Sequence, residues 1–314
     1  MNFSRLFSIS TTLALFSLSA CNGQSGSGTS ASAANDNLDG SDSSASTAPQ
    51  ANSSGTTPVP GAPVVSPIPN SSPSPSAPPK VVRTYKVDAL LFAGDGTWGV
   101  EVSSLESILK SHNSTYKKVT SAQLDALSLD ELAQFGVLIF PGGSGGSQAD
   151  SLSSATHARL RAAVQERGVS YIGFCAGAFI AVAPAPAPGR DVSYGLGIVP
   201  GEVLEYYYLE YQINPDIAMT LATFADGSTH DLLWYGGPVT PNTPGGVIAK
   251  YPNGDPAISQ TFSGKGFVII SGPHPAAPQS VRNSYGLDDS DGTDFELTWK
   301  LISSAMRQQP LQAF

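Results

Sequence analysis

Three apolar runs, each of which meets a glycine at or just beyond its end, constrain the fold of this chain more than any other feature. They are 85–94 (YKVDALLFAG), 135–143 (FGVLIFPGG) and 169–175 (VSYIGFC). Segments 99–112 and 155–168, which we expect to be helices, lie between them. Strands buried on both faces read as continuous apolar runs, and their alternation with helices is typical of a parallel sheet that is covered on both faces.

The C-terminal part adds strands of another kind. Segments 247–251 and 257–262, joined by P-N-G-D-P, are typical of an antiparallel hairpin, and 266–275 is a further apolar strand. We expect helices over 121–134 and over 293–307, which has an acidic first turn and a basic last turn. The predicted fold is α/β: a flavodoxin-like three-layer sandwich with a mostly parallel central sheet, plus an antiparallel hairpin.

The N-terminus has the parts of a signal peptide. One arginine, Arg5, precedes an apolar stretch that is too short to span a bilayer as a stable helix. The stretch ends in L-S-A-C (18–21), which resembles the lipobox of bacterial lipoproteins. The resemblance implies a lipoprotein signal peptide over residues 1–20 and a lipid on Cys21; the alternative is an ordinary secretory signal. Asn22, where lipoproteins retained in the inner membrane usually carry Asp, favours the outer membrane, facing the periplasm or the surface.

Residues 21–82 have the composition of a tether. Beyond Cys21 they are mostly Ser, Ala, Gly, Pro, Thr and Asn, which bury too little apolar surface to offset their ordering entropy. We therefore expect one folded domain over residues 83–314, joined to a membrane only through the lipid on Cys21. The net charge of −9 argues against nucleic acid as a partner.

Three expected strand ends carry the residues with chemical potential. They read P-G-G-S-G-G (141–146), G-F-C-A-G (173–177) and S-G-P-H-P (271–275). Functional sites of open α/β sheets lie at the carboxyl ends of strands. A strand that runs directly into a helix at Cys175 is typical of a nucleophile elbow, and the alternative is a small buried cysteine at a strand end.

The flanking residues favour the nucleophile. Backbone N–H groups of Gly142, Gly143 and Ala176 are the expected donors to an oxyanion. His274, held between two prolines at a rigid strand end, is the expected base. The alternatives are a glycine loop without a role and a structural histidine. The other histidines, His112, His157 and His230, are expected on the solvated surface.

The motifs V-L-I-F-P-G-G, Y-I-G-F-C-A-G-A, Y-G-G-P and I-S-G-P-H-P together resemble the biotin-protein ligase N-terminal domain family. That family lies within the class I glutamine amidotransferase-like superfamily. The resemblance implies a triad of Cys175, His274 and an acid two residues after the histidine. That position holds Ala276, so the orienting carboxylate must come from elsewhere, with Asp288, Asp289, Asp291 and Glu101 as candidates.

The functional hypothesis is hydrolysis or transfer of an amide or acyl group of a small molecule or peptide, through a thioester on Cys175 and without a cofactor. The alternative, favoured by Ala276, is a non-catalytic module that binds a ligand or partner. A third hypothesis is redox or reactive-carbonyl chemistry at the cysteine.

Two further segments have an unusual composition. L-D-D-S-D-G-T-D (287–294) resembles part of a calcium loop, but Leu287 and Thr298 occupy its first and last ligand positions, so we expect an acidic cap before the last helix and no metal. The tyrosine-rich segment 199–211 is expected to pack rather than to bind.

Overall fold

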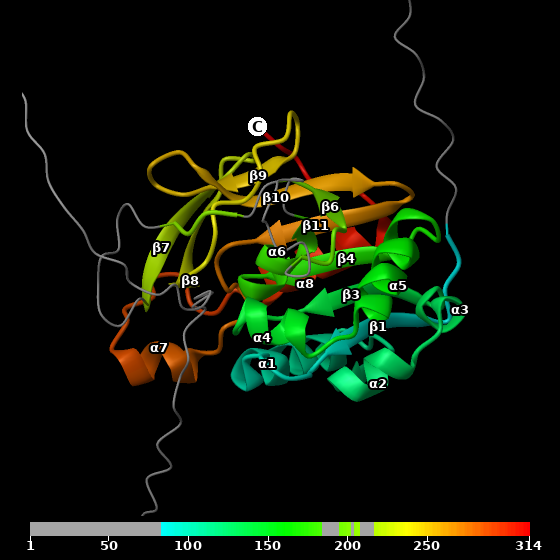
Figure 1. Ribbon diagram of the computed structural model, residues 1–314. Coiled ribbons are helices and arrows are strands. Elements are labelled where there is room, and N and C mark those ends of the chain that lie inside the picture. Colours follow the sequence, from blue (N-terminus) through cyan, green and yellow to red (C-terminus); the bar gives the residue numbers. More distant parts are fainter. Residues whose placement is uncertain (1–82, 184–194, 202–203, 208–216) are drawn as a thin grey trace, which may run out of the picture. The chain divides into compact units, whose positions relative to one another are not determined.

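The computed structural model describes residues 83–183, 195–201, 204–207 and 217–314 (Figure 1). The expected signal peptide, the expected lipidation site Cys21 and the expected tether lie outside the described residues. Within these described ranges, no helix combines the length and apolarity that crossing a membrane requires.

A nine-stranded sheet organises the described part of the chain, in the order β2-β1-β3-β4-β11-β10-β9-β7-β8 (Figure 1). Its strands are β1 (Val87–Phe92), β2 (Tyr116–Val119), β3 (Phe135–Phe140), β4 (Ser170–Phe174), β7 (Ile217–Phe224), β8 (Thr229–Tyr235), β9 (Val247–Lys250), β10 (Pro256–Ser263) and β11 (Gly266–Ser271). Neighbours are parallel from β2 to β11 and antiparallel from β11 to β8. The predicted parallel core and hairpin are confirmed, and the antiparallel part is larger than predicted. Short strands β5 (Val182–Ala183) and β6 (Val199–Pro200) pair separately.

Helices cover both faces of the parallel part. They are α1 (Gly99–Ser111), α2 (Ser121–Ala126), α3 (Leu129–Leu132), α4 (Gly145–Asp150), α5 (Ser154–Gln165), α6 (Ala176–Ala181) and α8 (Phe295–Arg307). Helix α7 (Gln279–Tyr285) instead packs through Val281 against Ile217 of β7 and Leu233 of β8. Along β1, Ala89 and Leu91 share a core with α1 and α8, whereas Leu90 and Phe92 share one with α2, α3, α5 and α6. This alternation, one side chain to each face, makes the three layers that the continuous apolar runs predict.

The prediction of a single helix over 121–134 is wrong, because this segment forms two helices. The structure forms α2 and α3 instead, and each begins with its own capping box, Thr120 with Gln123 and Ser128 with Glu131. In a capping box the two side chains satisfy backbone N–H groups that have no partner inside a helix. The second capping box therefore starts a new helix at a point where the apolar spacing alone predicts that a single helix continues.

The three strands of this sheet that the sequence did not predict lie at or next to its edges. β2 (YKKV) is short and polar, and β7 and β8 form an antiparallel pair around a turn in which Gly227 has φ 88°. Edge strands carry weaker apolar patterns than central ones, because one side or one face of them meets solvent. The predicted hairpin of β9 and β10 is confirmed, with the Tyr251 N–H donating to the Asp255 carbonyl across its turn.

Candidate active site

Cys175 lies at a strained turn between β4 and α6. Its backbone has φ 46° and ψ −102°, a combination that costs a non-glycine residue about 1–3 kcal/mol. The turn is held from both sides: the Cys175 N–H donates to the Ser271 carbonyl of β11 over 2.7 Å, and the Tyr171 hydroxyl donates to the Gly177 carbonyl over 2.7 Å. The backbone is therefore that of the predicted elbow.

The two glycines of G-F-C-A-G permit the close packing of this elbow. A Cβ atom on Gly177 would lie 2.2 Å from the Phe140 carbonyl oxygen of β3, and one on Gly173 would lie 2.3 Å from the Gly177 carbonyl oxygen. Both are backbone atoms, which cannot rotate away. Glycine is thus required at these positions by close approach of the backbone.

We expect Gly177→Ala to lower the free energy of unfolding by about 1–3 kcal/mol, the usual cost of overpacking a buried site. Gly99→Ala at the start of α1 is the matched control, because a Cβ there meets nothing within 4 Å. Urea unfolding of both variants measures the difference. Equal stability of the two variants would mean that the elbow relaxes without cost.

His274 and Glu101 form a buried pair beside the elbow. The imidazole Nδ1 lies 3.0 Å from Glu101 Oε1, and the two side chains are 1% and 0% exposed. The other carboxylate oxygen of Glu101 accepts a hydrogen bond of 2.5 Å from the backbone N–H of Gly142. The backbone N–H of His274 donates to the Leu233 carbonyl over 2.7 Å. A carboxylate on Nδ1 fixes the ring orientation and stabilises the imidazolium form. Of the four candidate acids, Glu101 is therefore the one that the structure places against His274.

The absence of an acid at position 276 has a packing reason. Ala276 is fully buried in the apolar core that α1 and α8 share with the sheet. A carboxylate at this buried position would lose its hydration. Asp289 and Asp291 lie in another cluster, described below, and Asp288 is exposed.

Strand β8 and Trp98 connect the cysteine to the histidine. The Cys175 thiol donates to the Tyr235 carbonyl over 3.6 Å, two residues along β8 from the Leu233 carbonyl that binds His274. The Trp98 ring meets the imidazole edge-to-face at 5.1 Å between centroids and the Tyr235 ring at 6.0 Å. Neither β8 nor Trp98 was predicted for the site; the Y-G-G-P motif that ends β8 was the one signal for that strand.

The glycine loop has more than one role. Because its N–H already donates to Glu101, Gly142 holds the acid rather than an oxyanion. A Cβ on Gly142 would also lie 2.3 Å from His274 Cε1, so the ring packs directly on this glycine. Gly143, with φ 134°, pairs with Thr97. Gly143 and Ala176 stay the predicted oxyanion donors.

The site is closed to solvent. Cys175 is 0% exposed, and the Tyr206 side chain packs against Cys175 and Ala176. The Tyr206 ring also meets Phe179 of α6 at 4.8 Å between centroids. A reagent therefore needs local opening to reach the thiol.

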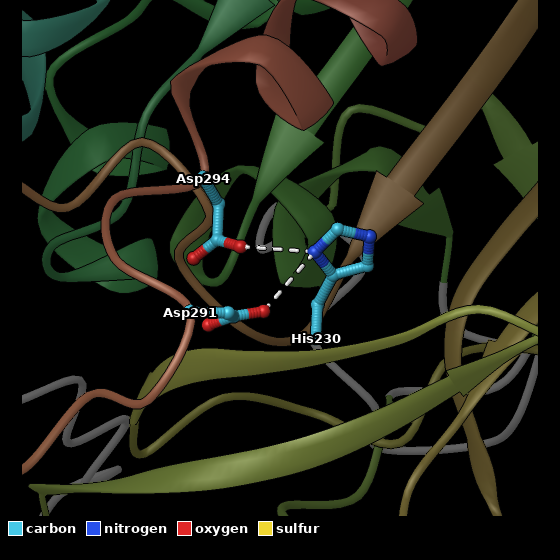
Figure 2. Close-up of side chains that lie close together, drawn as sticks. All are labelled: His230, Asp291 and Asp294. Carbon is cyan, nitrogen blue, oxygen red and sulfur yellow. Dashed lines mark ion pairs between the residues drawn. The ribbon is translucent and has the colours of Figure 1, made fainter.

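A second cluster of titratable groups lies at the other end of β8. Arg282, fully buried on α7, pairs with Asp289 at 2.5 Å and with Asp294 at 3.0 Å. His230 faces Asp294 and Asp291 (Figure 2). Burial raises the pKa of Asp294 to about 7. Arg282 opposes this rise, and the neighbouring carboxylates add to it.

This cluster corrects two expectations. His230 is half-buried against carboxylates rather than surrounded by solvent. Asp294 is the N-cap residue of α8, but its side chain makes no capping hydrogen bond. The other two histidines have local partners, since His112 stacks on Trp299 and His157 contacts the Ala149 carbonyl.

A family model described as "Biotin-protein ligase, N terminal" matches residues 87–185. The resemblance predicted from the motifs is confirmed over these residues. They include Glu101, the glycine loop and Cys175, and end before His274. No curated protein matches the chain.

Solved structures resemble the chain at low identity. A crystal structure of a glutamine amidotransferase has 18% identity over 63% of this chain and 95% of that one, with a TM-score of 0.47. A thua-like protein from Bacteroides uniformis has 13% identity over 70% of this chain and all (100%) of that one, with a TM-score of 0.40. An exo-beta-1,4-mannosidase from an Opitutaceae bacterium has 12% identity over 70% of this chain but only 36% of that one, with a TM-score of 0.43.

Proposed function

We propose that this chain, whose residues 87–185 match the biotin-protein ligase N-terminal family, hydrolyses or transfers an amide or acyl group through a thioester on Cys175. The buried His274–Glu101 pair beside a strained cysteine elbow is the observation that carries the proposal. A nucleophile, a base and an orienting acid are the three parts that covalent acyl transfer requires. The order of the parallel strands, β2-β1-β3-β4-β11, supports a flavodoxin-like description of the domain.

Each residue has a defined part in the proposed reaction. The Cys175 thiol gives its proton to Nε2 of His274 as the sulfur attacks the carbonyl carbon of the substrate, forming a C–S bond. The imidazolium, held by Glu101 at Nδ1, returns that proton to the leaving amine or alkoxide as its bond to carbon breaks. Water or another nucleophile then attacks the thioester, loses its proton to His274, and regenerates the thiol as the C–S bond breaks.

Acylation of the intact protein tests this proposal. Incubation with p-nitrophenyl acetate, followed by mass spectrometry of the whole chain and of its peptides, is expected to place one acetyl group on Cys175. Cys175→Ala is expected to abolish the modification. Acetylation only at lysines, or at equal levels in Cys175→Ala, would contradict the proposal.

A second candidate function, a non-catalytic binding module, is supported by the complete burial of Cys175. The rate of Cys175 alkylation as a function of pH separates the two functions. If Cys175 is a nucleophile, its alkylation rate is expected to rise at a pH well below the pKa of a free thiol. If the chain is a binding module, the rate is expected to rise with pH as it does for a free thiol.

The proposed location is the bacterial outer membrane, through lipid on Cys21. The L-S-A-C box and the tether composition support it. Cys21→Ser is expected to move the protein from the membrane fraction to the soluble fraction on cell lysis. Retention of this variant in the membrane fraction would argue against the lipid anchor.

A further inference from the structure

Three potential metal-ligating side chains meet outside the segment that the family model matches. His230 lies near the start of β8, Asp291 lies in the loop between α7 and α8, and Asp294 directly precedes α8. Figure 2 shows both carboxylates directed at the imidazole Nδ1. One ligand atom of each residue lies within 4.8 Å of the other two.

The distances in this cluster fit a shared cation better than direct hydrogen bonds. His230 Nδ1 lies 3.3 Å from Asp294 Oδ1 and 3.5 Å from Asp291 Oδ2. A charge-assisted N–H···O bond is shorter, about 2.7–2.9 Å. Ligands about 2.0–2.1 Å from a tetrahedral ion are separated by about 3.3–3.4 Å, close to the two distances from Nδ1, and the two carboxylate oxygens lie within 4.8 Å of each other.

The buried carboxylate is oriented for this role. The Asp294 side chain is 2% exposed, and its Oδ2 accepts from Arg282, which leaves Oδ1 facing His230. Metal-binding groups are commonly fixed in this way by a second shell of hydrogen bonds. The cluster is open enough for an ion to enter, because the side chains of His230 and Asp291 are 32% and 36% exposed.

The cluster is rich in carboxylates. Arg282 pairs with Asp289 and Asp294, and His230 faces Asp291 and Asp294. Ser290 donates to Asp231, and the Asp231 N–H donates to Asp291 over 3.4 Å. Carboxylate oxygens are among the ligands that Zn²⁺ takes in proteins.

We propose that His230, Asp291 and Asp294 form a binding site for a divalent transition-metal ion of the Zn²⁺ class. One imidazole nitrogen with two carboxylates suits Zn²⁺, whereas Ca²⁺ takes oxygen ligands alone. Water would complete the coordination. The site ties β8, whose other end contacts Cys175 and His274, to the loop before α8. It stands whether or not the cysteine is catalytic.

Calorimetric titration of the full chain with ZnCl₂, after treatment with a chelator, tests the site. We expect saturable binding to a single site. His230→Gln and Asp291→Asn are each expected to weaken it by at least about tenfold, since even second-shell changes cost about 10–100-fold. Asp288→Asn is the matched control, because it removes one charge from the same loop at an exposed position, and it is expected to change the affinity by less than about twofold.

Specific outcomes would overturn the proposal. Absence of saturable binding in the unchanged protein would do so, as would wild-type affinity in His230→Gln. An equal loss in Asp288→Asn and Asp291→Asn would mean that the loop attracts cations only diffusely. Because a variant can fail to fold, Co²⁺ titration of the unchanged protein gives a second measurement: visible absorption is expected to saturate at one site and to disappear on adding Zn²⁺. Failure of Zn²⁺ to displace Co²⁺ would contradict a shared site.

Discussion

Glu101→Gln is expected to slow acylation of Cys175 by up to about 10⁴-fold, the loss seen when the acid of a catalytic triad is replaced by its amide. The glutamine side chain has the same shape but carries no charge to stabilise the imidazolium of His274. Its amide can also donate to Nδ1, which would favour the ring tautomer that cannot accept the thiol proton at Nε2. The rate of acetylation measured by mass spectrometry gives the result directly.

The control for this variant lies on the same helix. Glu106→Gln removes a carboxylate from α1 that pairs with Lys110 and Lys118 near the surface. It is expected to leave the acylation rate within about twofold and to cost less than about 1 kcal/mol of stability. Thermal unfolding of Glu101→Gln separates a misplaced helix from lost chemistry. A folded Glu101→Gln that is acylated at the wild-type rate would remove Glu101 from the mechanism.

Arg282→Ala is expected to lower the free energy of unfolding by about 3–5 kcal/mol, because it leaves two buried carboxylates without their cation. The side chains of Arg282, Asp289 and Asp294 are 0%, 2% and 2% exposed. Lys300→Ala is the matched control, since Lys300 pairs with Asp226 in an exposed ion pair and is expected to contribute less than about 1 kcal/mol. Urea unfolding checks both. A similar small effect in both variants would mean that the buried network contributes no more than a surface pair.

The same variant has a predictable pH dependence. The pKa of Asp294 is raised from 3.8 to about 7 in the folded protein, so the folded state binds this proton more tightly than the unfolded state. The stabilisation that protonation provides is full below the unfolded pKa and is lost as the pH rises through about 7. Because Arg282 opposes the rise, its removal moves the pKa of Asp294 higher still. In chelator-treated, metal-free protein, Arg282→Ala is therefore expected to lose less stability at about pH 5 than at about pH 8.

Local sequence motifs predict some residues of the candidate site but not all of them. Cys175, His274 and the glycine loop were predicted, because each follows an apolar run and has unusual neighbours in the sequence. Glu101 was one of four candidates with nothing local to distinguish it. It lies 173 residues from its partner His274, on a helix whose pattern is that of any amphipathic helix. Trp98 and β8 carried still weaker signals.

The order of the strands supplies the missing information. Glu101 follows β1, Gly142 follows β3, Cys175 follows β4 and His274 follows β11, and these four parallel strands are consecutive neighbours in the sheet. Parallel neighbours bring their carboxyl ends to one edge. The residues that follow the ends of these strands therefore meet, whatever their separation along the chain.

Local chemistry alone determined the strands that are buried on both faces, the glycine elbow around Cys175 and the paired capping residues of α2 and α3. These depend on side-chain volume, backbone freedom and hydrogen bonds within a few residues. Only the tertiary structure decided that Glu101 orients His274, that Ala276 packs in the core, and that His230 meets two aspartates. Those outcomes depend on which strands become neighbours, which is a property of the whole sheet and not of any one segment.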